Sequence, residues 1–169
     1  MTPAPKPKKE VKTTQIKGRS MGLTSSRLKD KPKKAQPAVQ RKKTLQRLEK
    51  ELDELWKKIV YKNWGNKCAW PGCKVTQPPK QLFCHHYFHK AQGNRARWEP
   101  LNGVLLCYGH HMGQVHRSGN VEPIREVLIK RIGIVGFEAL RLRVSVIFKP
   151  TLENLREMKE RLLSELEAK

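Results

Sequence analysis

The chain has 169 residues, room for one modest domain plus tails, and only 37% of them are hydrophobic, which predicts that part of it packs nothing. A net charge of +21, from 36 lysines and arginines against 15 acids, favours a polyanionic partner, nucleic acid before an anionic membrane. No apolar run reaches the roughly 18 to 20 residues needed to span a bilayer, and the N-terminus lacks the apolar core of a signal peptide. We therefore expect a cytoplasmic protein without membrane contact, whose four cysteines are metal ligands and not disulfides.

Residues 1–43 are predicted to form a disordered basic tail. They hold 14 lysines and arginines against only Glu10 and Asp30, and almost no large apolar residue that could be buried. Two roles stay open, a tail that grips DNA and a solvated segment that keeps the protein soluble. Residues 6–9 also leave a nuclear-localisation signal open.

From Thr44 the pattern changes to that of an amphipathic helix, at the start of a folded domain over residues 44–169. Thr44 is a suitable N-cap, and Gly65 would end the helix near Asn63. Trp56 and Val60 widen an apolar stripe with steps of three and four, formed by Leu45, Leu48, Leu52, Leu55 and Ile59. The stripe could form a coiled-coil homodimer. It covers barely two heptads, however, which favours packing against the chain's own C-terminal helix.

Two short-spaced pairs predict a structural zinc site. Cys68 and Cys73 flank a Pro-Gly turn that would bring both sulfurs to one ion, and Cys107 and His110 have the two-residue gap of a second half-site. We predict a Cys3His site made of these four residues. A core this small often needs a bound metal ion for its stability. The alternatives are two unrelated buried cysteines in the first pair, and an allocation of His110 to a catalytic site that would leave zinc three-coordinate.

Residues 81–86 and 104–107 are short, extended-looking runs on either side of a loop that contains Gly93, Asn94 and Arg95. A helix is expected to begin near Tyr108. Two strands and a helix on a zinc knuckle predict an α+β fold, with a small zinc-supported ββα-metal core flanked by long helices.

The order His86, Asn102, His111 among these cysteines resembles the HNH endonucleases. The pattern HHYFHK…RWEPLNGVLLC…HH, followed by residues 128–133, is more narrowly similar to the NinG/Rap family of phage recombination endonucleases. The resemblance covers about residues 45–165. It implies metal-dependent cleavage of DNA, with branched recombination intermediates such as D-loops and Holliday-type junctions as substrates, and phage recombination or packaging proteins as partners.

The resemblance also implies roles for individual residues. His86 would be the general base that activates water, since an imidazole can take a proton at neutral pH. His85 and His111 would ligate the catalytic ion, and the amide of Asn102 would tie the loop down and orient His86. His116 follows His111 by five residues instead of the four found in some relatives, so its part in the same site stays open.

The catalytic ion would be Mg²⁺, Mn²⁺ or another divalent cation, acting as a Lewis acid. His85 stands where many relatives carry Asp, and imidazole suits Mn²⁺, Ni²⁺ or Zn²⁺ better than Mg²⁺. His110 likewise replaces the usual fourth cysteine of the zinc site, which zinc still accepts.

The loop between the strands is predicted to contact DNA. Lys90, Arg95 and Arg97 would hold phosphates beside the cut, although plain solubility also explains them. Trp98 would stack on an unpaired base or belong to the core. His89 would contact a phosphate or be a solvated loop residue.

Three elements follow. Pro123 would open a helix through Arg131 that Gly133 closes, and residues 137–142 would form another helical turn. Residues 144–148 alternate as a short strand would, with helix left open. Thr151 would cap a final helix whose apolar face is formed by Leu152, Leu155, Met158, Leu162 and Leu166.

Two other functions remain open as alternatives to the recombination endonuclease. One is a non-catalytic zinc-ribbon protein that binds DNA. The other is a packaging-associated HNH nickase that works beside a phage terminase, with the same chemistry and a different partner.

Overall fold

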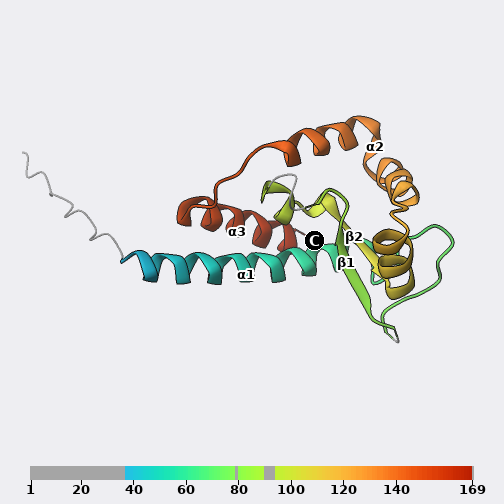
Figure 1. The fold of residues 1–169 in the computed structure, drawn as a ribbon, viewed down its shortest axis with the longest axis horizontal. Coiled ribbons are helices and arrows are strands. Elements are labelled where there is room, and N and C mark those ends of the chain that lie inside the picture. The colour runs from blue at the N-terminus through green and yellow to red at the C-terminus, as the bar shows by residue number, and fades with distance from the viewer. Residues whose placement is uncertain (1–36, 79, 90–93, 169) are drawn as a thin grey trace, which may run out of the picture. The chain divides into compact units, whose positions relative to one another are not determined.

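The computed structural model describes residues 37–78, 80–89 and 94–168, so most of the predicted basic tail lies outside the described residues. The fold is α+β and mostly helical, as predicted, with one two-stranded sheet (Figure 1). Its elements are α1 (Ala38–Trp64), β1 (Leu82–His86), the 3₁₀-helices η2 (Asn94–Trp98) and η3 (Pro100–Asn102), β2 (Gly103–Cys107), the π-helix η4 (Gly109–Arg117), α2 (Glu122–Ser145) and α3 (Leu152–Glu167).

Helix α1 begins at Ala38, six residues before the cap predicted at Thr44. The Thr44 hydroxyl instead donates a hydrogen bond of 2.9 Å to the carbonyl of Gln40, one turn earlier in the same helix. A threonine can satisfy its hydroxyl in this way inside a helix, so the cap prediction was wrong. The predicted end is confirmed, because Gly65 adopts the left-handed conformation that closes helices, with φ of 56°.

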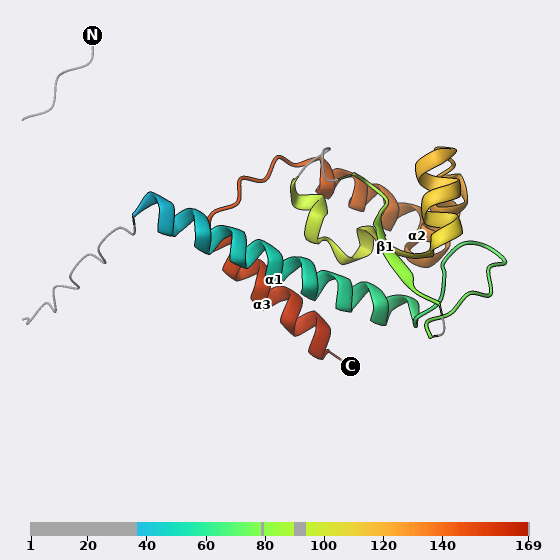
Figure 2. The same cartoon turned by 60° about the horizontal axis from the view of Figure 1, so that its bottom comes forward.

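Helices α1 and α3 pack side by side (Figures 1 and 2), as predicted for the apolar stripe. Leu52 and Ile59 of α1 and Leu155 and Leu162 of α3 are almost fully buried in one core. The predicted cap of α3 is confirmed, since the Thr151 hydroxyl oxygen accepts the backbone N–H of Asn154 at 3.1 Å. Helix α1 in turn packs against both strands of the sheet.

The sheet is antiparallel and pairs Leu82 with Cys107 and His86 with Gly103. Successive strand residues point to opposite faces, so β1 sends its side chains alternately to α1 and to η4. His86 stacks on Trp56 of α1, whereas Phe83 stacks on His111 of η4. The two neighbouring histidines of β1, His85 and His86, therefore serve different faces of the sheet.

Gly103 lets the sheet approach α1 closely. A Cβ atom at this position would lie 2.2 Å from Cγ2 of Val60 and 3.0 Å from the Trp56 ring. The indole N–H of Trp64 donates to the Gly103 carbonyl at 2.9 Å. A side chain here would push β2, and the ligands that follow it, away from α1.

Helix α2 breaks at Gly133, where φ is 74°, as predicted, and then continues to Ser145. The strand predicted over residues 144–148 is not formed. Val144 is buried inside the helix together with Leu140, and residues 146–150 form an irregular connection to α3. None of the helices in the described part of the chain is both long and apolar enough to cross a membrane.

Candidate functional site

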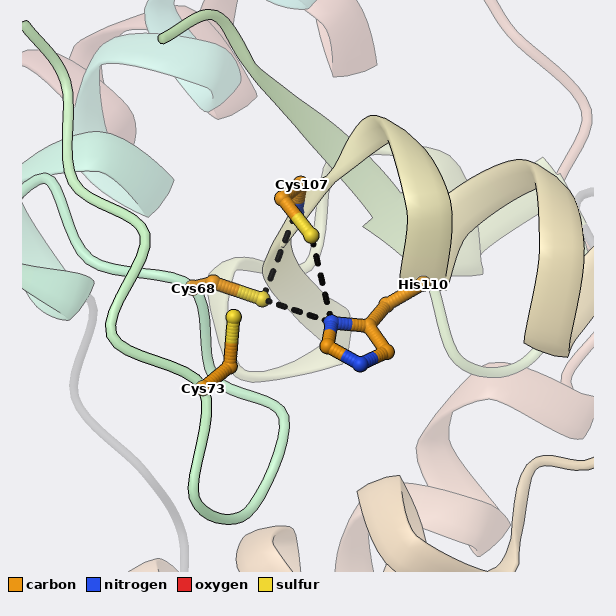
Figure 3. Close-up of side chains that lie close together, drawn as sticks. All are labelled: Cys68, Cys73, Cys107 and His110. Atoms are coloured by element: carbon orange, nitrogen blue, oxygen red, sulfur yellow. Dashed lines mark hydrogen bonds between the residues drawn. The ribbon is translucent and has the colours of Figure 1, made fainter. Parts of the chain in front are cut away.

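The four predicted zinc ligands meet in one cluster (Figure 3). The ligand atoms of Cys68, Cys73, Cys107 and His110 all lie within 4.8 Å of one another. Nδ1 of His110 is 3.1 Å from Sγ of Cys107 and 3.6 Å from Sγ of Cys68. The ligands of a tetrahedral zinc shell lie roughly 3.5 to 3.8 Å apart, from bond lengths of about 2.3 Å to sulfur and 2.0 Å to nitrogen. The cluster can therefore hold a metal ion such as zinc.

Local hydrogen bonds shape the knuckle that carries the first two cysteines. The N–H of Cys73 donates to the carbonyl of Trp70 at 3.0 Å, across a turn in which Gly72 has φ of 74°. The N–H of Ala69 donates to the carbonyl of Leu105 at 2.8 Å and joins the knuckle to β2. This bond brings the first pair of ligands to the second pair at the end of the same strand.

The electrostatics of the cluster also fit a cation. Burial raises the pKa of the Cys68 thiol to about 12, so a thiolate there needs a nearby positive charge. The backbone N–H of Cys107 already donates to this sulfur at 3.3 Å. The Trp70 ring stacks on His110 at 4.6 Å between centroids and covers one face of this half-buried ring. Four inward-facing donors with one shielded side are typical of a structural site.

A second cluster consists of His85 from β1 and His111 and His116 from η4. One ring nitrogen from each lies within 4.8 Å of the others. Nε2 of His111 and Nε2 of His116 are only 3.3 Å apart. Two protonated rings would repel at this distance, so the pair needs a proton or a cation between its nitrogens.

The π-helix explains why His116 joins this cluster. In an α-helix, residues five apart differ by about 140° around the axis and face different ways. A π-helix bonds residue i to residue i+5 and so places them above each other. The spacing of five that left His116 open in the sequence is the spacing that η4 requires.

His85 carries the strongest sign of a missing partner. Its side chain is only 4% exposed, and its Nε2 is buried with no hydrogen-bond partner among the described residues. Burial, and then the neighbouring His111 and His116, lower the pKa of His85 to about 3, so the ring is neutral and keeps a lone pair. An unsatisfied buried nitrogen is costly, and a cation held by the three imidazoles would satisfy it.

Asn102 directly precedes β2 and is fully buried. Its Oδ1 accepts the N–H of Phe88 at 2.8 Å, and its Nδ2 donates to the carbonyls of Phe88 and Ala96 at 2.9 and 3.0 Å. The amide thus ties the segment after β1 to η2, in agreement with the loop-anchoring role expected for it.

His86 is not brought into the three-histidine cluster. Its ring stacks on Trp56 at 3.9 Å, and its Nε2 lies 2.8 Å from the carbonyl of Arg97. This hydrogen bond places the ring proton on Nε2 and makes Nδ1 the basic nitrogen. His89, by contrast, meets His85 edge-on with ring centroids 6.2 Å apart, on the cluster's side of the strand.

Two residues predicted to contact DNA are used inside the protein. The Arg97 guanidinium binds Asp53 at 2.6 and 2.9 Å and Glu49 at 3.1 Å. The Trp98 indole donates to Asp53 at 2.9 Å, and its side chain is 1% exposed, so the base-stacking prediction was wrong and the core alternative holds. The acids come from α1, more than 40 residues away, which the sequence could not pair with them. Lys90 and the side chain of Arg95 lie outside the described residues.

Phe83 was not expected at the site. Its ring lies 5.6 Å from that of His111, with planes 8° apart. Strand alternation could have revealed it, because Phe83 precedes His85 by two residues and must share its face.

The stretch that carries both clusters is almost free of acids. Residues 55–121 contain ten lysines and arginines and one acid, Glu99, which is 8% exposed. Residues 55–121 therefore carry a formal net charge of +9, although Arg97 is paired with acids of α1.

Comparison of the chain with protein-family models, with curated proteins and with solved structures yields no match.

Proposed function

We propose that this protein is a divalent-metal-dependent endonuclease of the HNH type that hydrolyses DNA phosphodiester bonds. The observation that carries the proposal is the meeting of His85, His111 and His116, with a buried His85 nitrogen that lacks a partner, beside a separate four-donor cluster. A protein that only binds DNA needs the four-donor cluster of Cys68, Cys73, Cys107 and His110 and has no use for the three histidines.

In this proposal the three imidazoles hold the catalytic ion, and the Cys3His cluster holds zinc. When bound, a divalent cation supplies charge neutralisation at the phosphate and stabilises the leaving oxygen. The three imidazoles are neutral donors, which favours Mn²⁺, Ni²⁺ or Zn²⁺ over Mg²⁺. Asn102 keeps the segment after β1 in place through three hydrogen bonds, so His85 and His89 keep their spacing.

Two histidines are candidates for the base that takes the proton from water. His86 is the residue that the HNH resemblance implies, and its bond to the Arg97 carbonyl sets its basic nitrogen. His89 is exposed and meets His85 on the side of the sheet that faces η4. A base must reach the attacked water directly or through one further water, and single substitutions distinguish the two.

The substrate class proposed is branched DNA, such as D-loops and Holliday-type junctions. Its support is the NinG/Rap resemblance together with the acid-poor stretch around the clusters. A packaging-associated nickase would share the chemistry and differ in its partner.

One observation favours a rival, a non-catalytic zinc protein that binds DNA. The His86 ring packs against α1, on the face of the sheet opposite to His85, which suits a structural role. In that case the three-histidine cluster would be a second structural site.

The experiment uses the zinc-loaded full chain with linear, nicked, forked and four-way DNA, and Mg²⁺, Mn²⁺ or Ni²⁺ in parallel. We expect metal-dependent cleavage with a preference for branched substrates. Of the variants His86→Ala and His89→Ala, the one that removes the base should keep DNA binding and lose cleavage, while Gln114→Ala, an exposed change on η4, serves as the control. Binding without cleavage under every ion would establish the rival.

A further inference from the structure

We propose that Tyr108 is a stacking platform for an unpaired base of a single strand that passes the three-histidine cluster. The inference rests on the proposed action of that cluster on DNA, and it adds a preference for unpaired nucleotides. Tyr108 lies between Cys107 and His110, two members of the four-donor cluster, and its side chain is 62% exposed.

The position of Tyr108 is fixed although its ring is exposed. Its backbone stands between two converging ligands, so the ring is presented from a rigid base when the ion is bound. The Phe83 ring lies beside it at 6.1 Å between centroids, tilted by 59°. A preorganised aromatic face loses little conformational entropy on binding, which is what a stacking platform needs.

The platform leads to the three-histidine cluster. Phe83, which touches Tyr108, also stacks on His111. A row of three rings thus runs from the exposed Tyr108 to a member of the cluster. A strand with a phosphate at the cluster would bring a base within a few nucleotides of the Tyr108 face. A surface pocket lies beside the first two rings of this row, Tyr108 and Phe83, and Lys80 also lines it.

The lysine and the exposed ring at this pocket suit a nucleic acid strand as the occupant. Lys80 lines the pocket, and Arg117 directly follows His116. Glu99, the one acid of residues 55–121, is buried. An unpaired nucleotide offers both a phosphate for the cations and a flat apolar face for the ring. A duplex hides its base faces, so Tyr108 would discriminate in favour of single-stranded and branched DNA.

The test measures binding of the zinc-loaded full chain, by fluorescence anisotropy, to an oligothymidylate and to an abasic oligonucleotide of the same length. The two probes carry the same phosphates, and only the first carries bases. Tyr108→Ala should weaken oligothymidylate binding by about 5- to 150-fold, the range of one base–aromatic stack, and should weaken abasic binding far less. Tyr108→Phe should bind as the unchanged protein does.

The control Val135→Ala removes another exposed apolar side chain, 80% exposed on α2, and should affect neither probe. Zinc content is measured in each variant, and Tyr108→Phe, which keeps the ring, covers the case in which Tyr108→Ala loses zinc. Equal weakening for both probes, or loss of binding in Tyr108→Phe, would overturn the stacking role. The binding test is independent of cleavage. If Tyr108→Ala weakens only oligothymidylate binding but the protein cleaves no DNA, the nuclease proposal fails and the stacking role stands. If the protein cleaves DNA but Tyr108→Ala does not weaken oligothymidylate binding, the stacking role fails and the nuclease proposal stands.

Discussion

The two candidate metal clusters use neighbouring residues of one helix for opposite purposes. His110 turns inward to three cysteines behind the Trp70 ring, whereas His111 turns to two other imidazoles, one of them on the exposed His116. The first cluster has the four donors that close a zinc shell, and the second has three, which leaves positions for other ligands. The difference teaches that two histidines joined by one peptide bond can belong to a closed and to an open candidate metal cluster.

The largest expected effect is on the closed cluster. Cys107→Ser should lose zinc and the cooperative unfolding transition, because structural zinc contributes about 10 to 16 kcal/mol in small zinc domains, as much as a whole domain's stability. Zinc content and circular dichroism measure this outcome.

Cys84→Ser is the matched control for that change. Cys84 lies on the α1 side of the sheet near the Lys57 carbonyl, and burial raises its thiol pKa to about 12, so it stays neutral. It should keep the zinc. A loss of zinc equal to that of Cys107→Ser would break the assignment of the four ligands.

Next in size is the open cluster. His111→Ala should keep structural zinc and the fold but bind no second divalent ion, seen by calorimetric titration with Mn²⁺. Cleavage should fall about 100- to 10,000-fold, since a metal ion supplies several kcal/mol of transition-state stabilisation. If His111→Ala also released the structural zinc, the two clusters would be one functional unit and the comparison would fail.

A smaller effect is expected at Asn102, which anchors the segment after β1. Asn102→Ala should lower the free energy of unfolding by about 2 to 5 kcal/mol, because it leaves buried groups of Phe88 and Ala96 unpaired. Urea denaturation gives the value, and Asn120→Ala, an exposed change after η4, is the control. If Asn102→Ala lowered the free energy of unfolding by no more than Asn120→Ala does, the segment after β1 would not depend on the Asn102 amide.

The smallest effect for a single step, here one pH unit, is a pH dependence of stability that His85 contributes. The pKa of His85 is about 3 in the folded protein against an ordinary value of 6.5, so unfolding takes up a proton between these values. The His85 contribution to stability is therefore complete above about pH 6.5 and declines as the pH falls toward 3, by at most about 1.4 kcal/mol per pH unit.

Urea midpoints at several pH values, without an added second ion, measure this decline. His85→Gln should show a shallower pH dependence than the unchanged protein, and the difference isolates His85 from the zinc ligands. Parallel curves for the two proteins would mean that His85 does not titrate as a buried neutral imidazole.

The four members of the closed cluster were predictable from the sequence because the pattern that pairs them is local. Cys68 and Cys73 share one turn, and Cys107 and His110 share another, so short spacing alone pairs them. The strands that hold His85 and Cys107 were also predictable. The predicted ranges, 81–86 and 104–107, differ by one residue from the observed strands Leu82–His86 and Gly103–Cys107. Asn102 was found through the HNH resemblance, and the structure gives it three hydrogen bonds.

Only the tertiary structure decided where the remaining side chains point. His86 faces α1 because strand residues alternate and Trp56 offers it a ring. Arg97 and Trp98 bind acids of α1, a pairing that no local pattern encodes. His116 reaches its partners because η4 is a π-helix, a backbone form that a sequence spacing of five does not reveal by itself. The sequence determined which residues could bind metal, and packing between distant elements decided which of them meet, because each direction is set by neighbours far away in the chain.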